Sequence, residues 1–127
     1  MSRPLLTLLA LGILFGCTRG QSSSSVPSPS DESAVIAGDS LYGRVGCDRC
    51  HGVDAGGTLN GGSLRTTNWK FNNGSFDDLV RVIAEGVPAS ALHDRTRRQG
   101  MPPRGGAAIT GEQIRQLAAF VYAISKR

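Results

Sequence analysis

The chain of 127 residues lacks the features that mark several large classes of protein. Its longest apolar run, Leu5 to Phe15, is far shorter than the roughly 20 residues that a membrane-spanning helix needs. No segment alternates apolar and polar residues convincingly, so a sheet is not expected. Aromatic residues make up only 6%, and the net charge of +4 is small and scattered. We therefore expect no integral membrane protein and no nucleic-acid partner.

The N-terminal segment has the pattern of an export signal. Arg3 supplies positive charge before the apolar run, which ends at Leu14-Phe15-Gly16-Cys17. A small residue followed by Cys resembles the lipobox of bacterial lipoproteins, in which cleavage leaves the Cys as a lipidated N-terminus. The pattern predicts a signal peptide over 1–16 and lipidation of Cys17, with an ordinary secretory signal as the alternative. The protein would then be exported and lipid-anchored to a membrane, on its periplasmic side or at the outer cell surface.

Residues 17–33 are rich in Ser and Pro and contain one aliphatic residue, Val26. Such a segment buries too little apolar surface to offset its chain entropy, so we expect a flexible tether that starts at Cys17. The remaining residues, 34–127, would form one folded domain. At 94 residues this domain is marginal for a self-sufficient core, and its high glycine content predicts many loops.

Three segments of this domain have helical periodicity. The first is expected over 34–47, and the second over 75–85, where Ser75 is suited to the N-cap and Gly86 to the C-terminal end. The third begins at Thr110, where Thr110 and Gln113 form a capping-box pattern, and runs towards the C-terminus. The domain is therefore predicted to be all-α and loop-rich, with few helices for its length.

The chemistry-bearing motif is Cys47-Asp48-Arg49-Cys50-His51, the C-x-x-C-H signature of covalent haem c attachment. Two thiols three positions apart reach the two vinyl groups of one porphyrin, and the next residue directs its imidazole at the iron. Three other interpretations remain open, namely a thiol-redox pair, a structural disulfide and part of a zinc site. The cysteine count favours haem, because Cys17 is assigned to lipid and no thiol is left over.

A haem iron bound by His51 needs a sixth ligand or has an open site. Met101 is the single thioether of the mature chain, and it lies in Gln-Gly-Met-Pro-Pro, a loop that two prolines rigidify. We predict Met101 as the sixth ligand. His93 is the competing ligand, and a Met that only fills the core is the non-functional interpretation.

These motifs, in this order, resemble class I cytochrome c, the small carriers with one haem. The resemblance covers the whole domain, 34–127, and implies three to five short helices wrapped around one covalent haem c. It pairs Gly38 of the first helix with Phe120 of the last, where the two helices would cross closely. Family members often carry a Pro whose carbonyl accepts from the proximal imidazole, but this chain has Gly61-Gly62-Ser63-Leu64 there. Trp69 would either hydrogen-bond a haem propionate or fill the core.

With His51 and Met101 both bound, the iron has no open position, which predicts an electron carrier rather than an enzyme. The sequence leaves open whether this carrier is free or is the electron-transfer subunit of an oxidoreductase complex. Its partners would be a redox donor and a redox acceptor, and the protein is expected to be monomeric. Four arginines near Met101 could steer such partners electrostatically, or could simply be solvated: Arg95, Arg97, Arg98 and Arg104. The alternative function is a peroxidase-like catalyst or gas sensor with an open or labile sixth site.

Overall fold

The structure is a computed structural model, which describes residues 26–92 and 99–127. Along the chain it has α1 (Glu32–Arg44), α2 (Asp48–His51), α3 (Phe76–Glu85), the 3-10 turns η1 (Ala89–Ala91) and η2 (Pro103–Gly106), and α4 (Gly111–Ser125). Within the described ranges there is no strand, and the β-type pairing is one isolated bridge between Val87 and Met101. The all-α prediction is confirmed. No helix of the described part is long and apolar enough to cross a membrane.

The first helix begins and ends earlier than the sequence predicts. Asp31 caps it by accepting the backbone N–H groups of Ser33 and Ala34, so Asp31–Ser33, which the sequence assigned to the tether, belong to the helix start. The helix ends at Arg44, because the chain turns at Gly46, whose φ of +82° favours glycine. Cys47 then opens the separate helix α2.

The two other predicted helices start at their predicted caps. The hydroxyl of Ser75 accepts the Asp78 N–H at 3.2 Å. Thr110 and Gln113 form the complete capping box, with hydrogen bonds of 3.2 and 2.9 Å. α3 then stops at Gly86, which has a φ of +76°.

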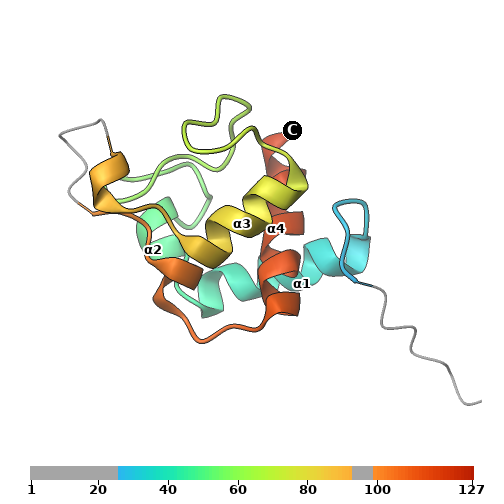
Figure 1. The fold of residues 1–127 in the computed structure, drawn as a ribbon. Helices are drawn as coiled ribbons and strands as arrows, with labels where there is room; N and C mark the ends of the chain where they lie inside the picture. The colour runs from blue at the N-terminus through green and yellow to red at the C-terminus, as the bar shows by residue number, and fades with distance from the viewer. Residues whose placement is uncertain (1–25, 93–98) are drawn as a thin grey trace, which may run out of the picture.

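Helices α1 and α4 cross at very close range (Figure 1). A Cβ atom on Gly38 would overlap the backbone carbonyl of Gln116 and would lie 2.8 Å from the Cβ of Phe120. Beside this point, the rings of Tyr42 and Phe120 pack with their centroids 5.4 Å apart. The predicted pairing of Gly38 with Phe120 is therefore confirmed, and it sets the distance between the two helices.

The core forms around α4, whose residues Leu117, Ala118 and Ala119 are almost completely buried. α1 and α3 both pack against this helix. At the N-terminal end, the Arg115 Nε of α4 donates to the carbonyl of Pro27 at 3.0 Å, and its guanidinium lies 4.9 Å from the centre of the Phe76 ring. The chain is therefore attached to the domain from Pro27 onward.

We predict that Gly38→Ala lowers the free energy of unfolding by about 3 kcal/mol, because the two backbones must separate to admit a methyl group. Chemical denaturation of the protein measures this change.

Gly43→Ala is the matched control, since Gly43 is also in α1 and a Cβ placed on it would have no neighbouring atom within 4 Å. Alanine there should leave stability unchanged or raise it by about 0.5–1 kcal/mol through helix propensity. Equal effects of the two substitutions would contradict the close crossing.

Candidate functional site

The C-x-x-C-H motif forms a single helical turn that follows directly from α1. Cys47 caps α2, and its carbonyl accepts the N–H of His51 at 2.9 Å. Gly46 and Gly52 bound the turn, each with a φ near +80°. The described cysteines, Cys47 and Cys50, are both free thiols rather than a disulfide.

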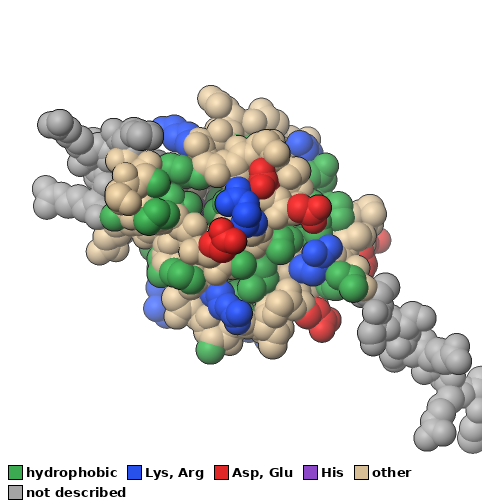
Figure 2. Space-filling view, in the orientation of Figure 1, with side chains coloured by type: hydrophobic (Ala, Val, Ile, Leu, Met, Phe, Trp, Pro, Cys, Tyr) green, Lys and Arg blue, Asp and Glu red, His purple; other side chains and the backbone are tan. Residues whose placement is uncertain are grey.

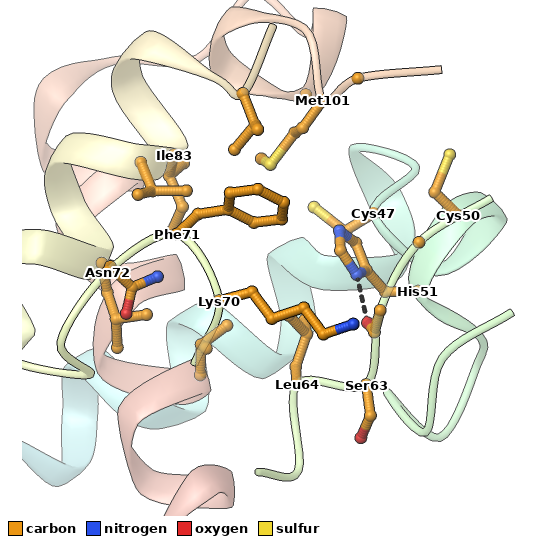
Figure 3. A pocket seen from close by; sticks show the side chains of 18 of the residues that line it. Cys47, Cys50, His51, Ser63, Leu64, Lys70, Phe71, Asn72, Ile83 and Met101 are labelled. Carbon is orange, nitrogen blue, oxygen red and sulfur yellow. Dashed lines mark hydrogen bonds between the residues drawn. The ribbon is translucent and has the colours of Figure 1, made fainter. Parts of the chain in front are cut away.

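The imidazole of His51 is oriented by a backbone oxygen. Its Nδ1 lies 2.8 Å from the carbonyl of Gly62 (Figure 3), which leaves Nε2 as the nitrogen available to a metal. A Cβ on Gly61 would lie 2.6 Å from the Cys50 carbonyl oxygen and 3.0 Å from His51 Nδ1. The loop can approach the ring this closely because glycine stands there. The acceptor that the sequence left unidentified is thus the Gly62 carbonyl.

The rest of the loop after the motif is tied back to it. The Gly57 N–H donates to the His51 carbonyl at 2.8 Å, and the Thr58 hydroxyl donates to the Cys50 carbonyl at 2.5 Å. From α1, the Tyr42 hydroxyl donates to the Gly52 carbonyl at 2.7 Å. Burial raises the pKa of Tyr42, so this phenol stays a donor at physiological pH.

One cavity of about 740 Å³ brings together all four predicted haem-binding residues: Cys47, Cys50, His51 and Met101. This volume is typical of a cofactor site. Figure 3 shows the Met101 and His51 side chains projecting into the same space from different segments of the chain. The apolar part of the wall comes from α3, α4 and the loops: Leu64, Leu79, Val82, Ile83, Val87, Leu92, Leu117 and Val121.

The backbone of Met101 is fixed against the end of α3. The Val87 N–H donates to the Met101 carbonyl at 2.8 Å. A Cβ on Gly86 would overlap that carbonyl, and a Cβ on Gly100 would overlap the carbonyl of Val87. Two glycines therefore permit the close pairing that holds Met101 at the cavity.

The cavity also has polar groups at its wall. The indole Nε1 of Trp69 is buried and has no hydrogen-bond partner among the described residues. Lys70 and Arg104 line the same cavity, and no acidic side chain of the described residues does. A buried donor without a partner, in a cavity that cationic side chains also line, suits the carboxylates of a haem. Sequence reasoning singled out Trp69 but missed the lining residues Lys70 and Phe71, because nothing in their local pattern marks them.

The competing interpretations of the motif gain no support from this geometry. Burial and the neighbouring Asp48 carboxylate raise the pKa of the Cys47 thiol, whereas a redox-active thiol needs a lowered pKa. In residues 26–92 and 99–127, no three His, Cys, Asp or Glu side chains gather as a metal-binding group. The competing ligand His93 lies outside the described residues.

The described surface is electrically balanced. Residues 26–92 and 99–127 contain nine basic and nine acidic side chains, and both signs are interspersed on the face shown in Figure 2. Arg81, for example, pairs with Asp78 at 3.1 Å and with Glu85 at 3.8 Å. The net positive charge of the chain therefore comes from the parts outside the description. Of the four arginines near Met101 in the sequence, Arg104 is described and exposed, whereas Arg95, Arg97 and Arg98 are not described, so the choice between steering and solvation stays open.

An all-α domain with a C-x-x-C-H turn and a methionine on one apolar cavity has the architecture of a c-type cytochrome. The family model described as "Cytochrome C oxidase, cbb3-type, subunit III" matches residues 33–121. The chain belongs to this family, and the predicted cytochrome c fold is confirmed. The cavity and its donor set fit the haem c that this family implies.

Curated relatives and a solved structure agree with this assignment. The chain is 36% identical over 93 residues to the "Cbb3-type cytochrome c oxidase subunit FixP" of Sinorhizobium medicae (strain WSM419), which covers 73% of the chain and 31% of the relative. It is 28% identical over 95 residues to the subunit CcoP of Rubrivivax gelatinosus, covering 75% and 27%. The chain thus spans about a third of the length of these relatives.

A similar solved structure is that of cytochrome CL from the marine methylotrophic bacterium Methylophaga aminisulfidivorans MPT. The TM-score is 0.56 at 26% sequence identity, and the match covers 73% of this chain and 54% of that one. Both comparisons align the same kind of domain with most of this chain.

We predict that Tyr42→Phe lowers the free energy of unfolding by about 1–2 kcal/mol, because the Gly52 carbonyl loses its donor in a partly buried place. Denaturant titration of the wild-type and variant proteins measures this difference in the free energy of unfolding. Tyr122→Phe is the matched control, since the Tyr122 hydroxyl makes no hydrogen bond with the described residues. A loss no greater than that of the control would show that the bond adds nothing.

Proposed function

We propose that this protein is a membrane-tethered electron carrier with a single haem c, bonded covalently to Cys47 and Cys50 and ligated by His51 and Met101. The observation that carries the proposal is the meeting of these four side chains on one largely apolar cavity. When bound, haem c supplies an iron that alternates between the ferric and ferrous states and so carries one electron at a time.

In this proposal each side chain has a distinct task. Cys47 and Cys50 hold the porphyrin edge from one helical turn, and the Gly62 carbonyl keeps the His51 ring in the orientation that presents Nε2. Met101 adds a thioether ligand, which favours the ferrous state and raises the reduction potential relative to two histidines. Because the protein would supply both His51 and Met101, gain or loss of an electron by the haem would require little rearrangement of these side chains.

The polar wall of the cavity would receive the haem carboxylates. The Trp69 indole N–H and the Lys70 ammonium are the proposed partners of the propionates, because both line the cavity and the indole is otherwise unpaired among the described residues. The apolar side chains of α3 and α4 would exclude water from the porphyrin faces. A dry site reduces solvent reorganisation when the iron changes charge.

Membrane attachment through Cys17 is part of the proposal. Because Arg115 holds the Pro27 carbonyl, the free tether would extend from Cys17 to Val26. Ten residues of this composition have a root-mean-square span of roughly 16–19 Å. In Figure 1 the chain enters the domain beside the start of α1, at the opposite end from α2. The haem-bearing side would therefore face away from the attachment point, where a redox donor and acceptor can reach it.

We predict that Met101→Ala keeps the covalent haem but removes the weak sulfur-to-ferric charge-transfer band, lowers the reduction potential and opens the iron to carbon monoxide. The reason is that the thioether ligand is lost while Cys47, Cys50 and His51 remain. Absorption spectroscopy of both oxidation states and a potentiometric titration measure these changes.

His93→Ala is the matched control, because His93 is the competing ligand, and it should leave the spectrum and potential unchanged. If Met101→Ala leaves the spectrum unchanged, the His/Met assignment is wrong. A wild-type protein that is high-spin and binds carbon monoxide readily would instead support a catalyst or gas sensor. Absence of covalent haem would refute the proposal as a whole.

We predict that the mature protein begins at a lipidated Cys17 and fractionates with membranes, because acyl chains bury apolar surface in the bilayer. Intact-mass spectrometry of the purified protein measures the added acyl mass. Exchanging residues 1–17 for a secretory signal without a Cys should release an equally haem-loaded protein into the soluble exported fraction. An unmodified N-terminus in the native protein would exclude the lipid anchor.

A further inference from the structure

The loop that presents Met101 has an unusual backbone directly after its two prolines. In η2, three successive residues have positive φ: Arg104 at +57°, Gly105 at +63° and Gly106 at +79°. Glycine adopts this region freely, whereas a residue with a Cβ adopts it at a cost. Arg104 therefore has a backbone conformation that glycine would adopt at lower cost. An interaction of its side chain can offset that cost.

The Arg104 side chain connects this loop to the start of α4. Its Nη1 donates to the carbonyl of Ile109 at 2.5 Å. Ile109 is itself buried, with 4% of its surface exposed, and it directly precedes Thr110, the N-cap of α4. Arg104 also lines the cavity. The bond thus reaches from the segment that carries Met101 to a fixed point of the core.

The Met101 segment is therefore held on two sides, by backbone contacts on one and by a side-chain hydrogen bond on the other. Towards α3 it is held through its backbone, by the bond from the Val87 N–H to the Met101 carbonyl and the close approaches at Gly86 and Gly100. Towards α4 it is held through the Arg104 side chain. A change in that side chain removes the second attachment directly, and the loop is then held against α3 by the first alone, so the Val87 amide reports how often the loop opens.

We propose that Arg104 is a positioning residue for Met101. Its hydrogen bond to the Ile109 carbonyl, which we call the latch, holds the Met101 loop closed and so limits how often the thioether leaves the iron. The inference rests on the proposed function, in which Met101 is an axial ligand. A thioether is a neutral, weak ligand, so the rate at which its loop opens determines how accessible the sixth position is to other molecules. The latch would keep the protein a carrier rather than a ligand-binding haem protein.

The test uses Arg104→Asn in the haem-loaded protein. Asn tolerates the left-handed conformation but is too short to reach Ile109, so the substitution removes the latch with little change in the backbone preference. We expect imidazole, a neutral probe, to displace the thioether about tenfold faster, as for the loss of one hydrogen bond from a charged group. Stopped-flow absorbance measures this rate. Amide hydrogen exchange at Val87, which donates to Met101, should also accelerate about tenfold.

Arg65→Asn is the matched control. Arg65 makes the same kind of bond, from its Nε to the Asp54 carbonyl at 2.5 Å, but on the loop that follows His51. Its loss should leave both the imidazole rate and the Val87 exchange unchanged. Arg104→Gly is a second test variant, which removes the side chain together with its backbone cost and should also open the loop.

The measurements test the Arg104 latch and the His/Met carrier separately. The proposed latch is wrong if Arg104→Asn binds imidazole and exchanges the Val87 amide at the wild-type rates. It is also wrong if Arg65→Asn accelerates both rates equally, or if Arg104→Gly is the one variant that accelerates them. If the wild-type protein shows no thioether ligation, the proposed His/Met carrier fails. Exchange at Val87 still reports in that case whether Arg104 closes the loop.

Discussion

The close crossing of α1 over α4 at Gly38 is the constraint on which the rest of the domain depends. α1 leads through one turn into Cys47, and α4 supplies the Leu117 and Val121 side of the cavity. The distance between these helices therefore sets how far the two cysteines proposed to attach the porphyrin lie from the α4 wall of the cavity. A backbone-to-backbone approach is stiffer than a contact between long side chains, because neither partner can change rotamer to absorb a shift.

His51 and Met101, the two proposed iron ligands, are positioned by the same principle at the wall of one cavity. His51 is oriented through the Gly62 carbonyl, and Met101 is fixed through its own carbonyl by Val87. In both places adjacent glycines admit an approach that a side chain would block. The abundance of glycine thus does more than mark loops, because some of these glycines lie where main chain approaches main chain beside a proposed ligand.

The sequence predicted those features that depend on side-chain identity at fixed spacing. The caps at Ser75 and Thr110, the C-x-x-C-H turn and the pairing of Gly38 with Phe120 are of this kind, and the structure contains them. The early start of α1 was missed because Asp31 lies in a Ser/Pro-rich stretch. The Lys70 lining and the Arg104 bond could not be predicted, because they depend on the path of loops that no local pattern specifies.

The oxygen that orients His51 belongs to the main chain, so every amino acid at position 62 would bring the same acceptor atom. What the interaction requires is therefore the path of this loop rather than a particular side chain at position 62. A search pattern that demands proline here would overlook chains built like this one. A steric constraint acts on the neighbouring residue, Gly61, where a single added carbon would press on both Cys50 and His51.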